Sequence, residues 1–138
     1  MRHFTKEWLK ASSDDILIIK EIITNKHLTH MVAFHAQQSV EKTLKSLIEE
    51  YEIDIPKIHK LVKLNNILES KFEKLDKNIL YKLDQLYIDS RYPGDMGLLP
   101  NGKPTLNEAE EFYNFALMVF DKSCSILKLD KNEFINND

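Results

Sequence analysis

The residues that break helices are confined to one short part of this 138-residue sequence. All 3 glycines and three of the 4 prolines lie between Pro93 and Pro104, and the remaining proline is Pro56. Glycine and proline are the residues least compatible with helix interiors, so the chain on either side can form long helices. No segment shows sustained alternation of apolar and polar residues, and no internal repeat is visible. The sequence therefore predicts an all-α fold with one long loop.

Apolar residues at helical spacing indicate where these helices lie. We expect them over residues 4–25, 29–51, 59–72, 77–90 and 105–127. Thr29 is placed to cap the second, and Thr105 with Glu108 forms a capping box at the start of the last. Four long helices and a shorter one predict an up-and-down antiparallel bundle around one core. The expected organisation is a single domain over residues 1–128 with a frayed tail over 129–138.

Composition narrows the function classes. A net charge of -3 argues against nucleic-acid binding that depends on an overall positive charge, although a local basic patch is compatible with it. The longest apolar runs, such as Ile16–Ile19, are far shorter than the roughly 20 residues of a membrane span. The first residues lack the apolar stretch of a signal peptide, and the single cysteine, Cys124, allows no internal disulfide. We expect a cytoplasmic protein that does not enter membranes.

A helical wheel divides the polar side chains of the stretch FHAQQSVEK, residues 34–42, into two groups. Gln37 flanks the core stripe, and its simplest role is a buried amide bonded to a partner such as Asp15. An unpaired buried amide would cost about 1–3 kcal/mol. The second group, His35, Gln38 and Lys42, points away from that core. These three side chains form either a solvated face or a site that another part of the protein covers.

Two further residues carry open alternatives. Arg91 and Arg2 are the only arginines among the 19 basic residues, and a guanidinium can hold a phosphate with two parallel hydrogen bonds. Arg91 lies at a predicted helix end, so it either stabilises the free carbonyls there or binds an anion. His59 lies at the start of the third predicted helix, where a protonated imidazole is disfavoured. It is therefore either neutral and packed or held by a carboxylate.

Other site chemistry has little support in the sequence. The only glycine cluster, GDMGLLPNG, lacks the GK[ST] ending of a phosphate-binding loop. His27 and His30 are three residues apart but have no carboxylate nearby at metal-ligand spacing. Cys124 lies in an apolar helix and is expected to behave as a small buried side chain. We expect no metal and no cofactor.

Four segments, taken in order along the chain, resemble the HEPN domain family (higher eukaryote and prokaryote nucleotide-binding). They are FHAQQSVEK at 34–42, PKIHKL at 56–61, SRYPGD at 90–95 and TLNEAEEFYNFA at 105–116. The resemblance covers about residues 4–127. It implies a helical bundle, commonly a homodimer, that is often encoded beside a minimal nucleotidyltransferase in prokaryotic toxin-antitoxin or defence systems. It also implies nucleotide binding, and many members look like metal-independent RNases.

The sequence departs from the pattern of the RNase branch, which has an arginine followed after four to six residues by a histidine. No histidine follows Arg91. Metal-independent RNA cleavage needs a base for the 2′-hydroxyl proton and a cation for the developing phosphorane charge. In this chain the pair can arise only in space, from Arg91 with His35 or His59.

The leading hypothesis is a protein that binds nucleotides or nucleic acid. In it Arg91 contacts phosphate, and Tyr92 offers a ring for stacking or a hydroxyl for hydrogen bonding. His35, Gln38 and Lys42 line the same cleft. The alternatives are a metal-independent endoribonuclease and a pure protein-interaction module that binds no nucleotide.

Overall fold

The part of the chain that the structure describes folds into five α-helices and a short 3₁₀ turn. This computed structural model describes residues 1–91 and 102–135, with only the backbone at Ser90 and Arg91. The elements are α1 (His3–Ile22), α2 (Thr29–Glu50), α3 (Leu61–Ile67), α4 (Lys77–Arg91), α5 (Leu106–Ile126) and η1 (Lys131–Glu133). The predicted all-α class is confirmed. Most of the predicted loop, Pro93–Pro104, lies outside the described residues.

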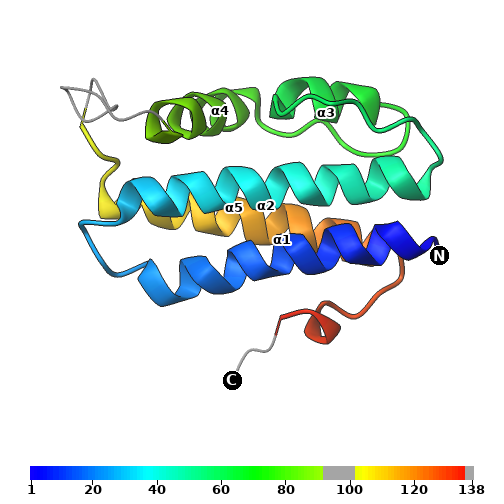
Figure 1. The fold of residues 1–138 in the computed structure, drawn as a ribbon, viewed down its shortest axis with the longest axis horizontal. Coiled ribbons are helices and arrows are strands. Elements are labelled where there is room, and N and C mark those ends of the chain that lie inside the picture. Colours follow the sequence, from blue (N-terminus) through cyan, green and yellow to red (C-terminus); the bar gives the residue numbers. More distant parts are fainter. Residues whose placement is uncertain (92–101, 136–138) are drawn as a thin grey trace.

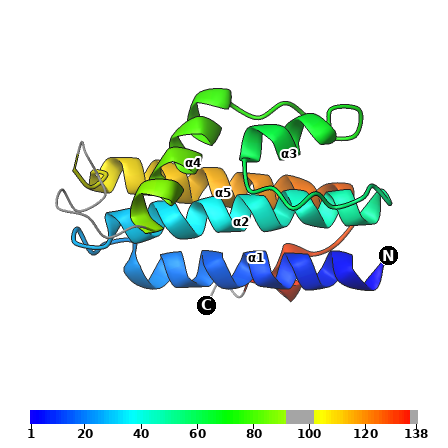
Figure 2. The same cartoon turned by 45° about the horizontal axis from the view of Figure 1, so that its top comes forward.

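Helix α2 is the centre of the bundle and contacts each of the other four α-helices. Of its 22 residues, 14 are buried, so it presents core-facing side chains in almost every direction. Neighbours α1 and α2 run antiparallel, as do α4 and α5, and α3 and α4 cover one side of α2 (Figure 1). A second view shows that α4 crosses α2 obliquely (Figure 2). The four long helices therefore alternate in direction, with α4 strongly tilted, whereas the short α3 runs in the same direction as α2 (Figure 1).

Helix α3 is shorter than the sequence pattern predicts. We expected a helix over residues 59–72, but α3 has only 7 residues. The Asn65 side chain explains the early end, because it donates to the Glu73 carbonyl (3.0 Å) and accepts from the Leu75 backbone N–H (2.9 Å). Asparagine side chains that bond to backbone compete with the helical pattern. Leu68 is fully buried although it lies beyond the end of α3. The apolar pattern therefore predicted the burial of this residue correctly but not its helical conformation.

The two predicted helix caps have different outcomes. Thr105 accepts a hydrogen bond from the Glu108 backbone N–H (3.0 Å), and the Glu108 carboxylate accepts one from the Thr105 N–H (3.1 Å), which confirms the capping box. Thr29 is not a cap. It is the first helical residue of α2, after Leu28, and its buried hydroxyl has no hydrogen-bond partner among the residues that the structure describes.

The C-terminal tail packs on the bundle up to Ile135, whereas we expected residues 129–138 to be frayed. The Ile135 side chain is 3% exposed, and it joins a second small core with Leu9, Ile16, Phe120 and Cys124. The turn η1 makes this possible, because the Ile135 N–H bonds to the Lys131 carbonyl (2.9 Å). A tail with a single buried anchor has no helical periodicity, so the amphipathic pattern could not indicate its packing.

Candidate functional site

Helix α1 supplies a buried carboxylate that binds two of the polar side chains of α2. The Asp15 carboxylate accepts a hydrogen bond from His35 Nδ1 on one oxygen and from Lys42 Nζ on the other, each at 2.8 Å. Asp15 itself is 5% exposed. His35 must be the donor, since a carboxylate only accepts. These contacts join α1 to α2 through one anion and two donors.

The outer-face interpretation is therefore wrong for His35 and Lys42. Their side chains are only 17% and 26% exposed because α1 covers them. A helical wheel drawn for one helix has no information about a second helix packed on its other side. Gln38 is partly buried as well, and its amide donates to the Gln37 side-chain carbonyl (2.8 Å).

Gln37 is the buried structural amide that the sequence predicts, but Asp15 is not its partner. Gln37 Nε2 donates to the His59 carbonyl (3.0 Å) and to the Asp84 carboxylate (3.3 Å), with Glu41 slightly farther away at 3.4 Å. The other Asp84 oxygen accepts the Leu61 backbone N–H (2.9 Å) at the start of α3. Burial raises the pKa of Asp84, and the hydrogen bonds from Gln37 and Leu61 oppose that shift. This network connects α2 to the start of α3 and to α4.

Glu41 resolves the alternatives for His59. One Glu41 oxygen accepts from both Lys45 Nζ (3.0 Å) and His59 Nδ1 (3.1 Å). Glu41 and Lys45 are buried, but the His59 side chain is 58% exposed. His59 is thus held by a carboxylate through Nδ1. Within the described residues, its second ring nitrogen, Nε2, forms no hydrogen bond.

Beside His59 the surface is hollowed between the start of α3 and the middle of α4. The hollow has a volume of about 300 Å³ and is lined by Ile58, His59, Lys60, Lys63, Asp84, Tyr87 and Ile88. The Tyr87 ring stacks on Phe34 of α2, with ring centroids 5.4 Å apart, and its centroid is 6.4 Å from that of His59. Phe34 also contacts the His35 ring (5.2 Å). A row of four rings therefore connects the two histidines.

Sequence reasoning missed Lys60, Lys63 and Tyr87. The signals were present, since the two lysines are three residues apart in PKIHKLVK and Tyr87 lies one helical turn before Arg91. Arg91 is the last residue of α4. Its side chain and the whole of Tyr92 lie outside what the structure describes.

The other candidates show no sign of a site. In the described part of the chain, no three His, Cys, Asp or Glu side chains come close enough together to hold a metal ion. Burial, helped by Lys103, lowers the pKa of His30. Burial also raises the pKa of the Cys124 thiol to about 12, which suits an inert core residue. None of the described helices is both long and apolar enough for a membrane span.

Replacing Asp15 by alanine should lower the free energy of unfolding by about 2–3 kcal/mol, because it leaves two partly buried donors without their acceptor. Asp14→Ala is the matched control, since Asp14 is exposed and next to it in α1. The control should change stability by less than about 0.5 kcal/mol. Urea unfolding monitored by circular dichroism measures both variants. Equal losses would contradict a special role for Asp15.

Comparison with known proteins completes the description. Neither curated proteins nor solved structures give a match to this sequence. A family model described as the HEPN domain matches residues 5–127, which is most of the chain. This range contains α2 to α5 and all of α1 except its first two residues, and it includes the polar networks around Asp15, Gln37 and Glu41. The chain therefore belongs to the HEPN domain family.

Proposed function

We propose that this protein binds nucleotides or nucleic acid at the hollow beside His59. The observation that carries the proposal is the combination of Lys60, Lys63 and Tyr87 around one concave surface. Ammonium groups attract phosphates, and an aromatic ring offers a stacking face that any base can use. Arg91 follows Tyr87 by one turn on α4, where a guanidinium would add a bidentate phosphate contact.

The residues first expected to bind the ligand then have two kinds of role. We assign direct ligand contacts to Arg91 and Tyr92, as the sequence motif SRYP suggests. His35, Gln38 and Lys42 have internal partners, so we assign them to holding α1 and the Gln37 amide in place. In this proposal they shape the binding surface from behind. The motifs FHxQQxxEK and SRYP would mark the branch of the family to which the chain belongs.

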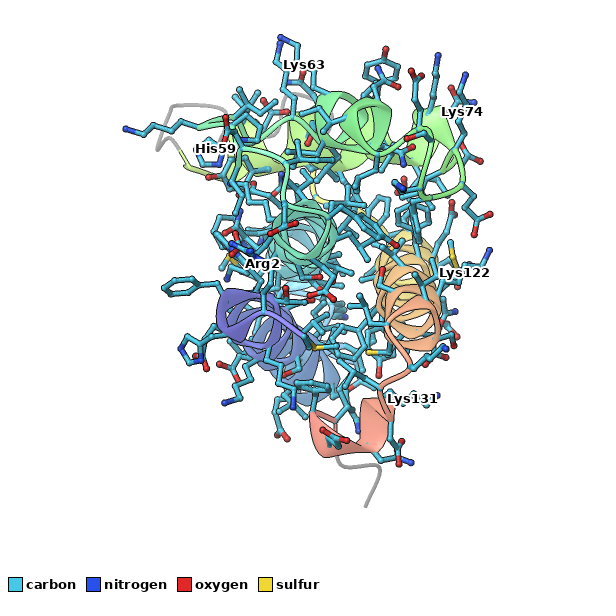
Figure 3. All side chains as sticks on the ribbon, turned by 90° about the vertical axis from the view of Figure 1, so that its right-hand side faces the viewer. Arg2, His59, Lys63, Lys74, Lys122 and Lys131 are labelled. Carbon is cyan, nitrogen blue, oxygen red and sulfur yellow. The ribbon has the colours of Figure 1, made fainter. Side chains whose placement is uncertain are left out.

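The double variant Lys60→Glu/Lys63→Glu should weaken binding of ATP, GTP or short RNA about tenfold or more, which corresponds to about 1.4 kcal/mol. Lys74→Glu/Lys77→Glu is the matched control, because it changes the net charge equally and both lysines are exposed. Lys74 also lies on the other side of the molecule from His59 (Figure 3). Isothermal titration calorimetry at about 100 µM protein measures both. The proposal fails if no ligand gives heat or if both double variants bind equally weakly.

A second candidate function is metal-independent cleavage of RNA, and the His59–Glu41 pair favours it. Glu41 accepts a hydrogen bond from the Nδ1–H of His59, which leaves Nε2 of this largely exposed side chain as the nitrogen able to accept a proton. In the reaction, Nε2 accepts the 2′-hydroxyl proton, the 2′-oxygen bonds to phosphorus, and the bond to the 5′-oxygen breaks. The imidazolium returns its proton to that oxygen, which gives a 2′,3′-cyclic phosphate and a 5′-hydroxyl. Arg91 would stabilise the phosphorane charge.

For the cleavage hypothesis, His59→Gln and Arg91→Ala should each lower the rate by about 100-fold or more. His3→Gln is the control, because His3 is exposed at the start of α1 and forms no ion pair with a carboxylate within the described residues. The assay follows labelled single-stranded RNA in excess EDTA. Cleavage that is equal in all four proteins, or absent from the wild type, would remove the enzyme hypothesis and leave the binding proposal intact.

We further propose a cytoplasmic homodimer that acts with a minimal nucleotidyltransferase in a toxin-antitoxin or defence system. Family membership supports this, and so do exposed apolar side chains on α1. Phe4 is 61% exposed and Ile18 is 42% exposed. The two residues are fourteen positions apart, which is two heptads, so they lie on the same face of α1. Such residues often form contacts between chains. The alternative function, a protein-interaction module that binds no nucleotide, would use the same surface.

The variant Phe4→Ser/Ile18→Ser should sediment as the 16.2 kDa monomer, and the wild type at twice that mass. Ile126→Ser is the control, since Ile126 is similarly exposed on α5. For the partner, a nucleotidyltransferase encoded next to this chain should co-purify with the wild type. A monomeric wild type contradicts the dimer. Co-purification that survives Lys60→Glu/Lys63→Glu, in the absence of any nucleotide binding, would favour the interaction module.

A further inference from the structure

A second hollow continues the first along the space between α3 and α4. It has a volume of about 500 Å³, and its lining shares Lys60, Lys63, Asp84 and Ile88 with the hollow beside His59. The new lining residues are Val62, Asn66, Tyr81 and Gln85. Because the two hollows share both walls, they form one surface. We call it the α3–α4 groove.

Each of the two hollows of the groove contains one tyrosine ring. Tyr81 is 58% exposed in the second hollow, and Tyr87 lines the first. Tyr87 follows Tyr81 by six positions, which corresponds to a rise of about 9 Å along the axis of α4. A stacked strand rises about 3.4 Å per nucleotide, so one nucleotide cannot reach both rings. The spacing instead fits a strand of two or more nucleotides.

The charged groups of the groove are shared by its two hollows. Lys60 and Lys63 line both hollows and are exposed. The one carboxylate among the lining residues, Asp84, accepts hydrogen bonds from Gln37 and from the Leu61 N–H. One base in each hollow, with phosphates at the lysines that the hollows share, would match this distribution of rings and ammonium groups.

The side-chain amides in the second hollow add hydrogen-bonding capacity. Asn66 and Gln85 lie on opposite walls, from α3 and α4. Amides can read the exposed edges of bases that are not paired. Stacking on Tyr81 and Tyr87 likewise needs bases that are free of a partner strand.

We propose that the ligand of the α3–α4 groove is a single-stranded oligonucleotide of at least two nucleotides, with Tyr81 as the second stacking site. This inference rests on the proposed function, because it names the ligand class for the same surface. It goes further in predicting that a mononucleotide fills only the half beside His59.

The test compares the binding of AMP, a four-nucleotide RNA and a duplex RNA hairpin by calorimetry and fluorescence anisotropy. Wild type should bind the single strand at least tenfold more tightly than AMP or the hairpin. Tyr81→Ala should weaken the single strand about fivefold or more and leave AMP unchanged, because stacking on one base is lost. Tyr81→Phe keeps the ring and should retain binding. Leu106→Ala removes an exposed apolar side chain that does not line the groove and should also have no effect.

The outcomes separate the two proposals. If neither AMP nor RNA binds, the proposed function itself fails. If AMP binds as tightly as the four-nucleotide strand, or if Tyr81→Ala leaves the strand unaffected, the groove inference fails and the hollow beside His59 stands as a mononucleotide site. Equal affinity for the hairpin overturns the single-stranded assignment.

Discussion

The hydrogen bonds of one buried amide set the positions of both walls of the α3–α4 groove. Gln37 has no exposed surface, and its amide donates to the backbone at His59 and to Asp84 on α4. Asp84 in turn accepts the first N–H of α3, from Leu61. Buried polar groups must be paired, so α2, α3 and α4 can come together only in the arrangement that satisfies this amide and this carboxylate. The concave surface between α3 and α4 is a consequence of that pairing.

Two buried carboxylates extend the same principle to the charges of α2. Asp15 binds His35 and Lys42, and Glu41 binds Lys45 and His59. A buried charge without a partner costs several kcal/mol, and two donors for each carboxylate remove that cost. The histidines of the two clusters differ in solvent exposure. His35 is covered by α1, whereas His59 is oriented by its carboxylate and still exposes most of its ring.

The sequence predicts what depends on local pattern and fails where a distant partner decides. Helix class and the Thr105 capping box follow from spacing within a few residues, and both are confirmed. The environment of His35 depends on α1, about 20 residues earlier in the chain, which no wheel of α2 contains. The end of α3 depends on Asn65 bonding to backbone up to 10 residues ahead.

For the candidate site too, the sequence indicated some of the residues and not others. The polar motif of α2 predicted a buried amide at Gln37, which the structure confirms with partners other than Asp15. It did not indicate that His35 and Lys42 both bind Asp15 of α1. Lys60 and Tyr87 come from different segments, and only the tertiary pairing through Gln37 and Asp84 brings those segments into one hollow.

The net charge of -3 is a poor guide to this surface, because the acidic groups nearest to it are already engaged. Glu41 is matched by Lys45 and His59, and Asp84 accepts two hydrogen bonds, while Lys60 and Lys63 project into the groove. Two lysines neutralise about two phosphates, and each contributes only modestly to affinity at physiological salt. Electrostatic attraction alone would therefore give only weak binding of a nucleic acid at this groove. In the proposed complex most of the affinity would come from stacking on the two tyrosine rings, and the preference for unpaired bases from these rings together with the Asn66 and Gln85 amides.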